Sequence, residues 1–151
     1  MGQSLAKIYI HLIFSTKYTY PFLKDEFRGR LHSYIGGSLG KLDSPPIKIN
    51  SVEDHMHILF RLSKNYSLAK IVEEVKKQSS KQIKQFNGGS KKFSWQDGYA
   101  AFSVSNSKVK TVSNYVENQK EHHTRLSFTE EVVEFIKNYD VVEYDEKYFW
   151  K

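Results

Sequence analysis

The sequence alternates between two kinds of apolar pattern, and their order limits the folds open to the chain. Short runs rich in β-branched and aromatic residues predict strands, whereas longer stretches with apolar residues at every third or fourth position predict helices. The runs give strand, helix, strand, strand, helix, strand, and then two more helices. This is the order of the split βαβ, or ferredoxin-like, arrangement. We therefore predict an α+β fold built on an antiparallel sheet.

The bounds of the expected elements come from capping and turn residues. The expected strands cover residues 7–16, 47–53, 55–63 and 99–105. The expected helices cover 22–35, 68–86, 108–123 and 128–140. Gly36 and Gly37 are expected to stop the first helix, which makes "GGSLGK" (36–41) a turn, and Ser67 is expected to cap the second. The first two helices would cover one face of the sheet, so the other face stays available for a C-terminal helix and for a site.

Length and composition narrow the class of protein. A chain of 151 residues fits one domain, 1–151, with a core large enough to fold unaided. The absence of cysteine excludes disulfide scaffolds and thiolate zinc sites, and it fits a reducing compartment. No apolar stretch is long enough to span a membrane, and the N-terminal residues do not resemble a signal peptide. We expect a cytoplasmic protein with no membrane partner.

The charge balance favours an anionic partner. The chain has 23 Lys and Arg against 17 Asp and Glu, for a net charge of +6. Such an excess is typical of proteins that bind nucleic acid, although a solvated lysine-rich surface would explain it equally well. Part of the excess falls in the second expected helix, where the candidate DNA-binding residues are Lys76, Lys77, Lys81 and Lys84.

Two histidines stand one residue apart in "DHMHILFRL". Side chains alternate along a strand, so His55 and His57 point to one face while Met56, Ile58 and Phe60 point to the other. The apolar residues would pack beneath the helices, which leaves both imidazoles on the other face, close enough to share a metal ion. The motif is short, and an incidental pair on a half-exposed strand would look the same.

A metal held by two histidines needs further ligands. The third expected helix carries Tyr115 and Gln119, which are four residues apart and therefore adjacent on one helical face. If this helix packs on the face that carries His55 and His57, it brings a phenol and an amide oxygen to the histidines. Asp54 is next to His55 in sequence, but its side chain is expected to face away.

Taken together, these motifs resemble the single-tyrosine HUH transposases of the insertion-sequence 200/605 type. The resemblance covers nearly the whole chain and rests on five segments in the order and spacing of that family. They are "IYIHLIFSTKYTYPFL", "DHMHILF", "SLAKIVEEVKKQSSKQI", "FSWQDGYAAFSVS" and "YVENQKEHH". The resemblance implies that His55 and His57 bind the metal, that Gln119 is the third ligand and that Tyr115 is the nucleophile.

The resemblance also implies an activity. The chain would cut and rejoin single-stranded DNA at hairpins near the ends of a mobile element, through a 5′-phosphotyrosine intermediate. It would work as a homodimer, with Tyr115 of one subunit serving the histidines of the other. Imidazole and amide-oxygen ligands suit Mg²⁺ or Mn²⁺, and Mn²⁺ tolerates histidine better. A phenol, with a pKa of about 10, needs such help near neutral pH.

Two other functions fit parts of the sequence. A non-catalytic ferredoxin-like module that binds nucleic acid would explain the charge, with exposed aromatic residues stacking on bases. The aromatic candidates are Trp95, Tyr99 and Phe102, although residues around a strand are more often core. A metal-dependent nuclease would keep the histidine site and make Tyr115 dispensable. His122 and His123 could contact phosphate, but histidines at a helix end are usually only favourable with the helix dipole.

Overall fold

A computed structural model describes residues 2–121, 126–139, 141 and 145–151 of the chain. Its four strands are β1 (Ile8–Ser15), β2 (Pro46–Ser51), β3 (His55–Leu62) and β4 (Ala100–Val104). They form one antiparallel sheet in the order β2-β3-β1-β4. This is the strand order of the split βαβ arrangement, so the predicted fold class is confirmed.

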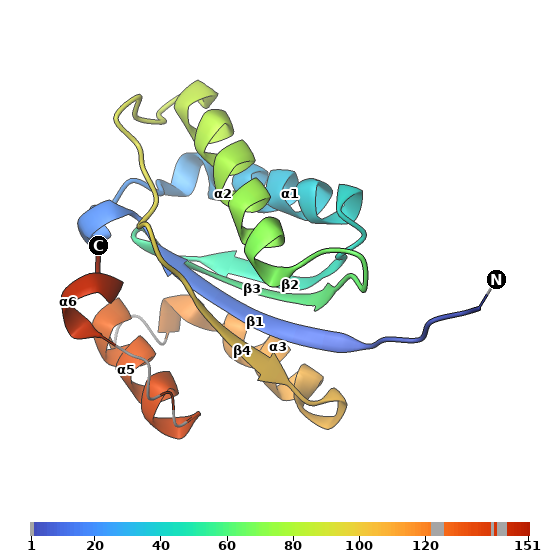
Figure 1. Ribbon diagram of the computed structural model, residues 1–151. Helices are drawn as coiled ribbons and strands as arrows, with labels where there is room; N and C mark the ends of the chain where they lie inside the picture. The colour runs from blue at the N-terminus through green and yellow to red at the C-terminus, as the bar shows by residue number, and fades with distance from the viewer. Residues whose placement is uncertain (1, 122–125, 140, 142–144) are drawn as a thin grey trace.

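The helices lie on both sides of the sheet (Figure 1). One side is covered by α1 (Asp25–Lys41) and α2 (Leu68–Gln85). The other side carries α3 (Val109–Glu117), α5 (Phe128–Asn138) and the short α6 (Glu146–Phe149). The layout therefore agrees with the prediction of two helices on one face and a C-terminal helix over the other. No helix in the described part of the chain is long and apolar enough to cross a membrane.

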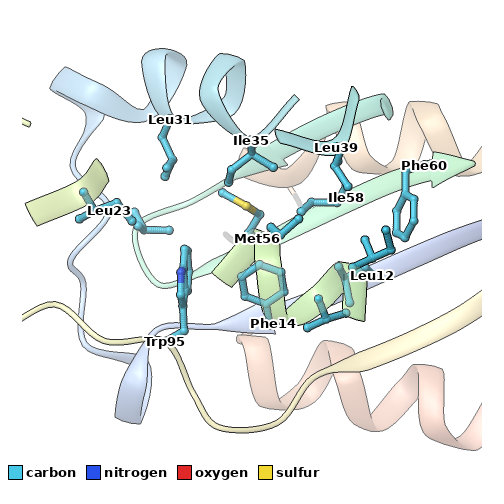
Figure 2. Packing of buried hydrophobic residues seen from close by; sticks show 14 of the residues in the cluster. Leu12, Phe14, Leu23, Leu31, Ile35, Leu39, Met56, Ile58, Phe60 and Trp95 are labelled. Carbon is cyan, nitrogen blue, oxygen red and sulfur yellow. The ribbon is translucent and has the colours of Figure 1, made fainter. Parts of the chain in front are cut away.

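The main core lies between the sheet and the first pair of helices (Figure 2). Strands β1 and β3 supply Leu12, Phe14, Met56, Ile58 and Phe60, and α1 supplies Leu31, Ile35 and Leu39. As predicted, Met56, Ile58 and Phe60 pack beneath the helices. Because side chains alternate, the intervening residues of β1 and β3 point to the other face, which is where His55 and His57 lie.

The predicted end of the first helix is wrong. Gly36 and Gly37 do not stop α1, which continues to Lys41, so the expected turn at 36–41 is helical. Leu39 continues the stripe of Ile35 and is fully buried. Burying a leucine is worth roughly 2 kcal/mol, which offsets most of the cost of Gly36, Gly37 and Gly40 at about 1 kcal/mol each.

The third expected helix is interrupted. Helix α3 ends at Glu117, Asn118 follows it in a non-helical conformation, and residues 119–121 are helical again. Asn50 of β2 gives the reason, because its Nδ2 donates hydrogen bonds to the carbonyls of Val116 at 3.1 Å and Glu117 at 2.8 Å. A side chain that takes the last carbonyls of a helix satisfies groups that helix geometry leaves unpaired. His122 and His123 lie outside the described residues.

A second apolar cluster holds the C-terminal part of the chain against the sheet. Ser127 begins α5 with a reciprocal capping box to Glu130. Phe128 and Val132 then pack with Ile13, Ala100 and Phe102 from the sheet. Phe149 and Trp150, from the aromatic C-terminal segment, pack against the same cluster. This packing brings one face of α5 toward β3.

Candidate active site

His55 and His57 lie side by side on β3, as the alternation of the strand predicts. Their ring centroids are 5.4 Å apart and the ring planes meet at 64°. Only 1% of His55 and none of His57 is exposed, because α3 and α5 cover this face of the sheet. The imidazoles are therefore in a buried site between a strand and two helices, and not on an open surface.

Glu131 of α5 brings a carboxylate to both histidines. Its Oε1 accepts a hydrogen bond from Nε2 of His57 at 2.8 Å and lies 3.3 Å from Nε2 of His55. One ligand atom from each of the three residues lies within 4.8 Å of the other two. Two imidazoles and a carboxylate at this separation form a group that could hold a metal ion.

Tyr115 of α3 reaches the same carboxylate from the other side. Its hydroxyl donates a hydrogen bond to Oε2 of Glu131, and its ring centroid is 5.9 Å from that of His57. The phenol and the histidines, which are far apart in sequence, therefore meet within one chain.

Gln119 follows the end of α3 and is fully buried. Its Nε2 lies 3.4 Å from the carbonyl oxygen of Tyr115. Its Oε1 has no hydrogen-bond partner among the residues that the structure describes. A buried amide oxygen without a donor is costly, so a cation or another donor at this position would be stabilising. The orphaned oxygen of Gln119 is therefore a candidate ligand beside the group formed by His55, His57 and Glu131.

Two further residues fix the orientation of the histidines. Nδ1 of His55 donates to Oδ1 of Asp54 at 2.7 Å, and Nδ1 of His57 pairs with Nε2 of His11 at 2.8 Å. Both histidines therefore turn their Nε2 atoms toward Glu131. Partners of this kind hold a ligating imidazole in one tautomer and one rotation.

The buried charges shift the pKa values within the site. Burial works against a charge on His55, but its hydrogen bonds to Asp54 and Glu131 outweigh burial and raise its pKa to about 9. Burial also opposes ionisation of Glu131, whose pKa is nevertheless lowered by hydrogen bonds from the two histidines. The pKa of Tyr115 is raised, first by burial and then by the hydrogen bond to Glu131. In this state the site contains a carboxylate and a phenol that keeps its proton.

Of these residues, sequence reasoning missed Glu131 and His11 and assigned Asp54 no role at the site. Glu131 had a visible signal, because it falls in the apolar stripe of its helix beside Phe128 and Val132, where a charged residue is unusual. His11 also carried a sequence signal. Strand alternation puts it on the same face as Ile13 and on the opposite face from Leu12 and Phe14. Asp54 lies just before β3, so strand alternation does not apply to it.

The four lysines of α2 do not share one environment. Lys77, Lys81 and Lys84 are exposed. Lys76 is partly buried, and its Nζ donates to the carbonyls of Gln96 at 2.8 Å and Gly98 at 2.5 Å. Burial lowers the pKa of Lys76 to about 8. Three of the four lysines therefore present their charge to solvent.

The aromatic residues that we considered for base stacking are not exposed. Trp95 is 6% exposed and belongs to the main core, where its Nε1 donates to Oγ of Ser79 at 3.0 Å. Phe102 is 5% exposed and stacks on Phe135 of α5. Tyr99 is partly buried against the main core. The expectation that aromatics around this strand are core residues is confirmed for Trp95 and Phe102.

Comparison with known proteins gives a family and two related folds. Residues 4–119 match the family described as "Transposase IS200 like". No curated protein matches the chain. A crystal structure of a candidate transposase from Deinococcus radiodurans R1 is similar, with 22% identity and a TM-score of 0.59 over 79% of this chain and 96% of that one. A REP-associated tyrosine transposase bound to a REP hairpin is also similar, with 15% identity and a TM-score of 0.61 over 83% of this chain and 74% of that one.

Proposed function

Because this chain belongs to the IS200-like transposase family, we propose that it cuts and rejoins single-stranded DNA through a covalent bond to Tyr115. The observation that carries the proposal is the meeting of the Tyr115 hydroxyl and the two histidines at the Glu131 carboxylate. A nucleophile beside a metal-type donor set is the arrangement that phosphoester transfer requires.

The proposed step exchanges one phosphoester for another. The Tyr115 oxygen attacks the scissile phosphorus, and the bond from phosphorus to the 3′ oxygen breaks. The leaving 3′ oxygen takes a proton from solvent, so the products are a 5′-phosphotyrosine and a 3′-hydroxyl. The reverse attack by a 3′-hydroxyl, which gives up its proton, rejoins the strand. No nucleotide cofactor is needed, because the energy of the phosphoester is kept. Oε2 of Glu131, which accepts the phenol hydrogen bond, is placed to receive the proton as the oxygen attacks.

The donor set fits a divalent cation. His55, His57 and Glu131 would hold it, and the buried Oε1 of Gln119 is a further candidate ligand. Two imidazoles with oxygen donors suit Mn²⁺, and they suit Mg²⁺ less well. When bound, the cation supplies positive charge that stabilises the phosphate during transfer. The chain's own contribution is orientation, because Asp54 and His11 fix the two imidazoles.

The proposed partner is single-stranded DNA with hairpins near the ends of an element, and the proposed location is the cytoplasm. The similarity to a transposase bound to a REP hairpin supports this proposal. The exposed Lys77, Lys81 and Lys84 are proposed to contact the DNA backbone. Lys76 is proposed for this role as well, and contact with DNA would require its ammonium group to give up its hydrogen bonds to the two carbonyls.

A denaturing gel tests the proposal directly. The protein is incubated with Mn²⁺ and labelled single-stranded hairpin DNA that carries candidate element ends. Wild type is expected to form a protein–DNA adduct that survives denaturation. Tyr115→Phe should form none, and His57→Ala should lose activity together with Mn²⁺ affinity. Tyr34→Phe, on the opposite side of the sheet, is the matched control and should act as wild type.

The two other functions give different results in the same assay. Cleavage that persists in Tyr115→Phe, with no adduct in wild type, would show a metal-dependent nuclease. Binding without cleavage at any cognate end would show a non-catalytic nucleic-acid-binding module. Either result would overturn the tyrosine mechanism.

A further inference from the structure

The turn that follows β1 carries the two most exposed aromatic side chains among the described residues. Tyr18 is 73% exposed and Tyr20 is 60% exposed. They flank Thr19 at the end of the short 3₁₀ turn η1 (Lys17–Thr19). The ring of Tyr20 rests on Phe22, with centroids 4.5 Å apart, so the side chain is supported from beneath while most of it stays in contact with solvent.

The backbone of this turn is strained. Tyr18 has φ of +56° and Thr19 has φ of +55°, in the left-handed region that side chains other than glycine rarely adopt. Two such residues in succession persist only where surrounding contacts hold them, and such sites are often functional. Here the strained turn directs the side chains of two tyrosines toward solvent, where they make few packing contacts.

The turn is tied to the strand end that carries the histidines. Ser15, the last residue of β1, pairs with His55. The next residue, Thr16, donates its backbone N–H to the Asp54 carbonyl at 2.9 Å, and its hydroxyl donates to the carbonyl of Tyr20 at 2.6 Å. Asp54 in turn binds Nδ1 of His55. Tyr18 and Tyr20 therefore stand at a fixed place just beyond the candidate active site.

The surroundings of the turn are suited to a nucleic-acid strand. Nζ of Lys17 lies 5.5 Å from the centre of the Tyr18 ring. An open hollow of about 810 Å³ begins at Pro21, directly after Tyr20. Its charged lining residues are the cations Lys24, Arg28 and Lys120 and the carboxylates Asp25 and Glu53, so cations are in the majority. Lys120 is the neighbour of the buried Gln119. The hollow thus connects the turn to the end of α3, and both places carry exposed lysines.

We propose that Tyr18 and Tyr20 form a stacking platform for unpaired bases of single-stranded DNA beside the cleavage position. The inference rests on the proposed function, since it assumes that the strand reaches the histidine site. Exposed aromatic rings next to cationic groups are how proteins hold single strands with little sequence preference. The net charge of +6 and the lysines of the hollow complement a polyanion.

The test measures binding without cleavage. Fluorescence anisotropy is recorded in the absence of metal with a dye-labelled oligothymidylate of about 20 nucleotides, a length that covers more than one stacking site. The variants are the doubles Tyr18→Ala/Tyr20→Ala and Tyr18→Phe/Tyr20→Phe. Tyr66→Ala is the matched control, because Tyr66 is also exposed but follows the opposite end of β3. A second oligonucleotide with one 2-aminopurine reports stacking through quenching of its fluorescence.

The alanine pair is expected to weaken binding at least about fivefold and to lose the quenching, because stacking contributes to affinity at each base. The phenylalanine pair should bind as wild type does, since it keeps both rings, and Tyr66→Ala should be unchanged. Equal binding by wild type and the alanine pair would overturn the proposal. So would failure of the phenylalanine pair to bind, an equal loss in Tyr66→Ala, or no binding by wild type. The covalent adduct assay reports separately on the function, so failure of one proposal is distinguishable from failure of the other.

Discussion

Lys76 and Lys77 are neighbours on α2, yet the helix turns their side chains into different surroundings. Lys76 reaches over the edge of the core and donates to carbonyls of the segment that precedes β4. Its ammonium group also lies 5.3 Å from the centre of the Phe14 ring. Lys77 is exposed. A charge count on the sequence cannot separate a lysine that holds a loop from one that faces solvent.

The contrast predicts different effects on stability. Lys76→Met should lower the free energy of unfolding by about 1–3 kcal/mol, because partly buried carbonyls lose their donor. Lys77→Met should change it by less than about 0.5 kcal/mol, as is usual for a surface site. Urea denaturation of both variants at neutral pH measures the difference. Equal stability of the two variants would contradict the role given to Lys76.

At the candidate site, sequence reasoning reached some residues and missed others for a physical reason. The pairing of His55 with His57 follows from strand periodicity, which is local. The approach of Glu131 depends on how α5 packs against the sheet through Phe128 and Val132, which is a long-range property. Gln119 was expected to join the histidines as a ligand. It is buried nearby, but whether it binds the metal stays a prediction.

Helix α3 is held on the sheet by apolar contacts along its length and by hydrogen bonds at its C-terminal end. Asn50 of β2 holds the carbonyls of Val116 and Glu117, one turn from Tyr115 or less. Val116 is fully buried between the helix and the sheet. The position of the phenol therefore depends on an amide from a strand that carries none of the proposed catalytic groups.

Asn50→Ala is expected to slow adduct formation without removing any group that touches DNA or metal. It should also lower the free energy of unfolding by about 1 kcal/mol, the usual worth of such a hydrogen bond. Asn114→Ala, at an exposed position of the same helix, serves as the control. Adduct rates for both variants should be compared at saturating Mn²⁺ and DNA. An unchanged rate in Asn50→Ala would mean that α3 is held by its apolar contacts alone.

The order and type of the elements could be predicted from the sequence, but two helix ends could not. Gly36 and Gly37 carry the local signal for a stop, and burial of Leu39 overrides it. The end of α3 depends on Asn50, which is 66 residues away from Val116 in sequence. Propensity describes a residue and its near neighbours, whereas both ends are decided by packing against β2.

In the molecule as a whole, the phenol and the histidines come from the same chain. The rings of Tyr115 and His57 meet edge-on, with their planes at 66°. This geometry supports a site that is complete within one subunit. The family resemblance implied a different arrangement, a homodimer in which Tyr115 of one subunit serves the histidines of the other.

Mixing two inactive variants distinguishes the arrangements. If each site is complete within one chain, equal amounts of Tyr115→Phe and His57→Ala should form no adduct together. In a dimer with shared sites, the mixture should recover up to about a quarter of the wild-type yield, because about half of the randomly paired dimers are mixed and each contains one intact site out of two. Gel quantification of the adduct after co-refolding measures the yield. The two single variants and refolded wild type are the controls.

The stretch that matches the family ends at Gln119, whereas Glu131 lies beyond it. Donors from both parts nevertheless meet around one point. The carboxylate of the group thus comes from helix α5, beyond the matched stretch, and the imidazoles come from strand β3 within it. A substitution at Glu131 would therefore change the charge of the candidate site without altering the sheet that carries the histidines.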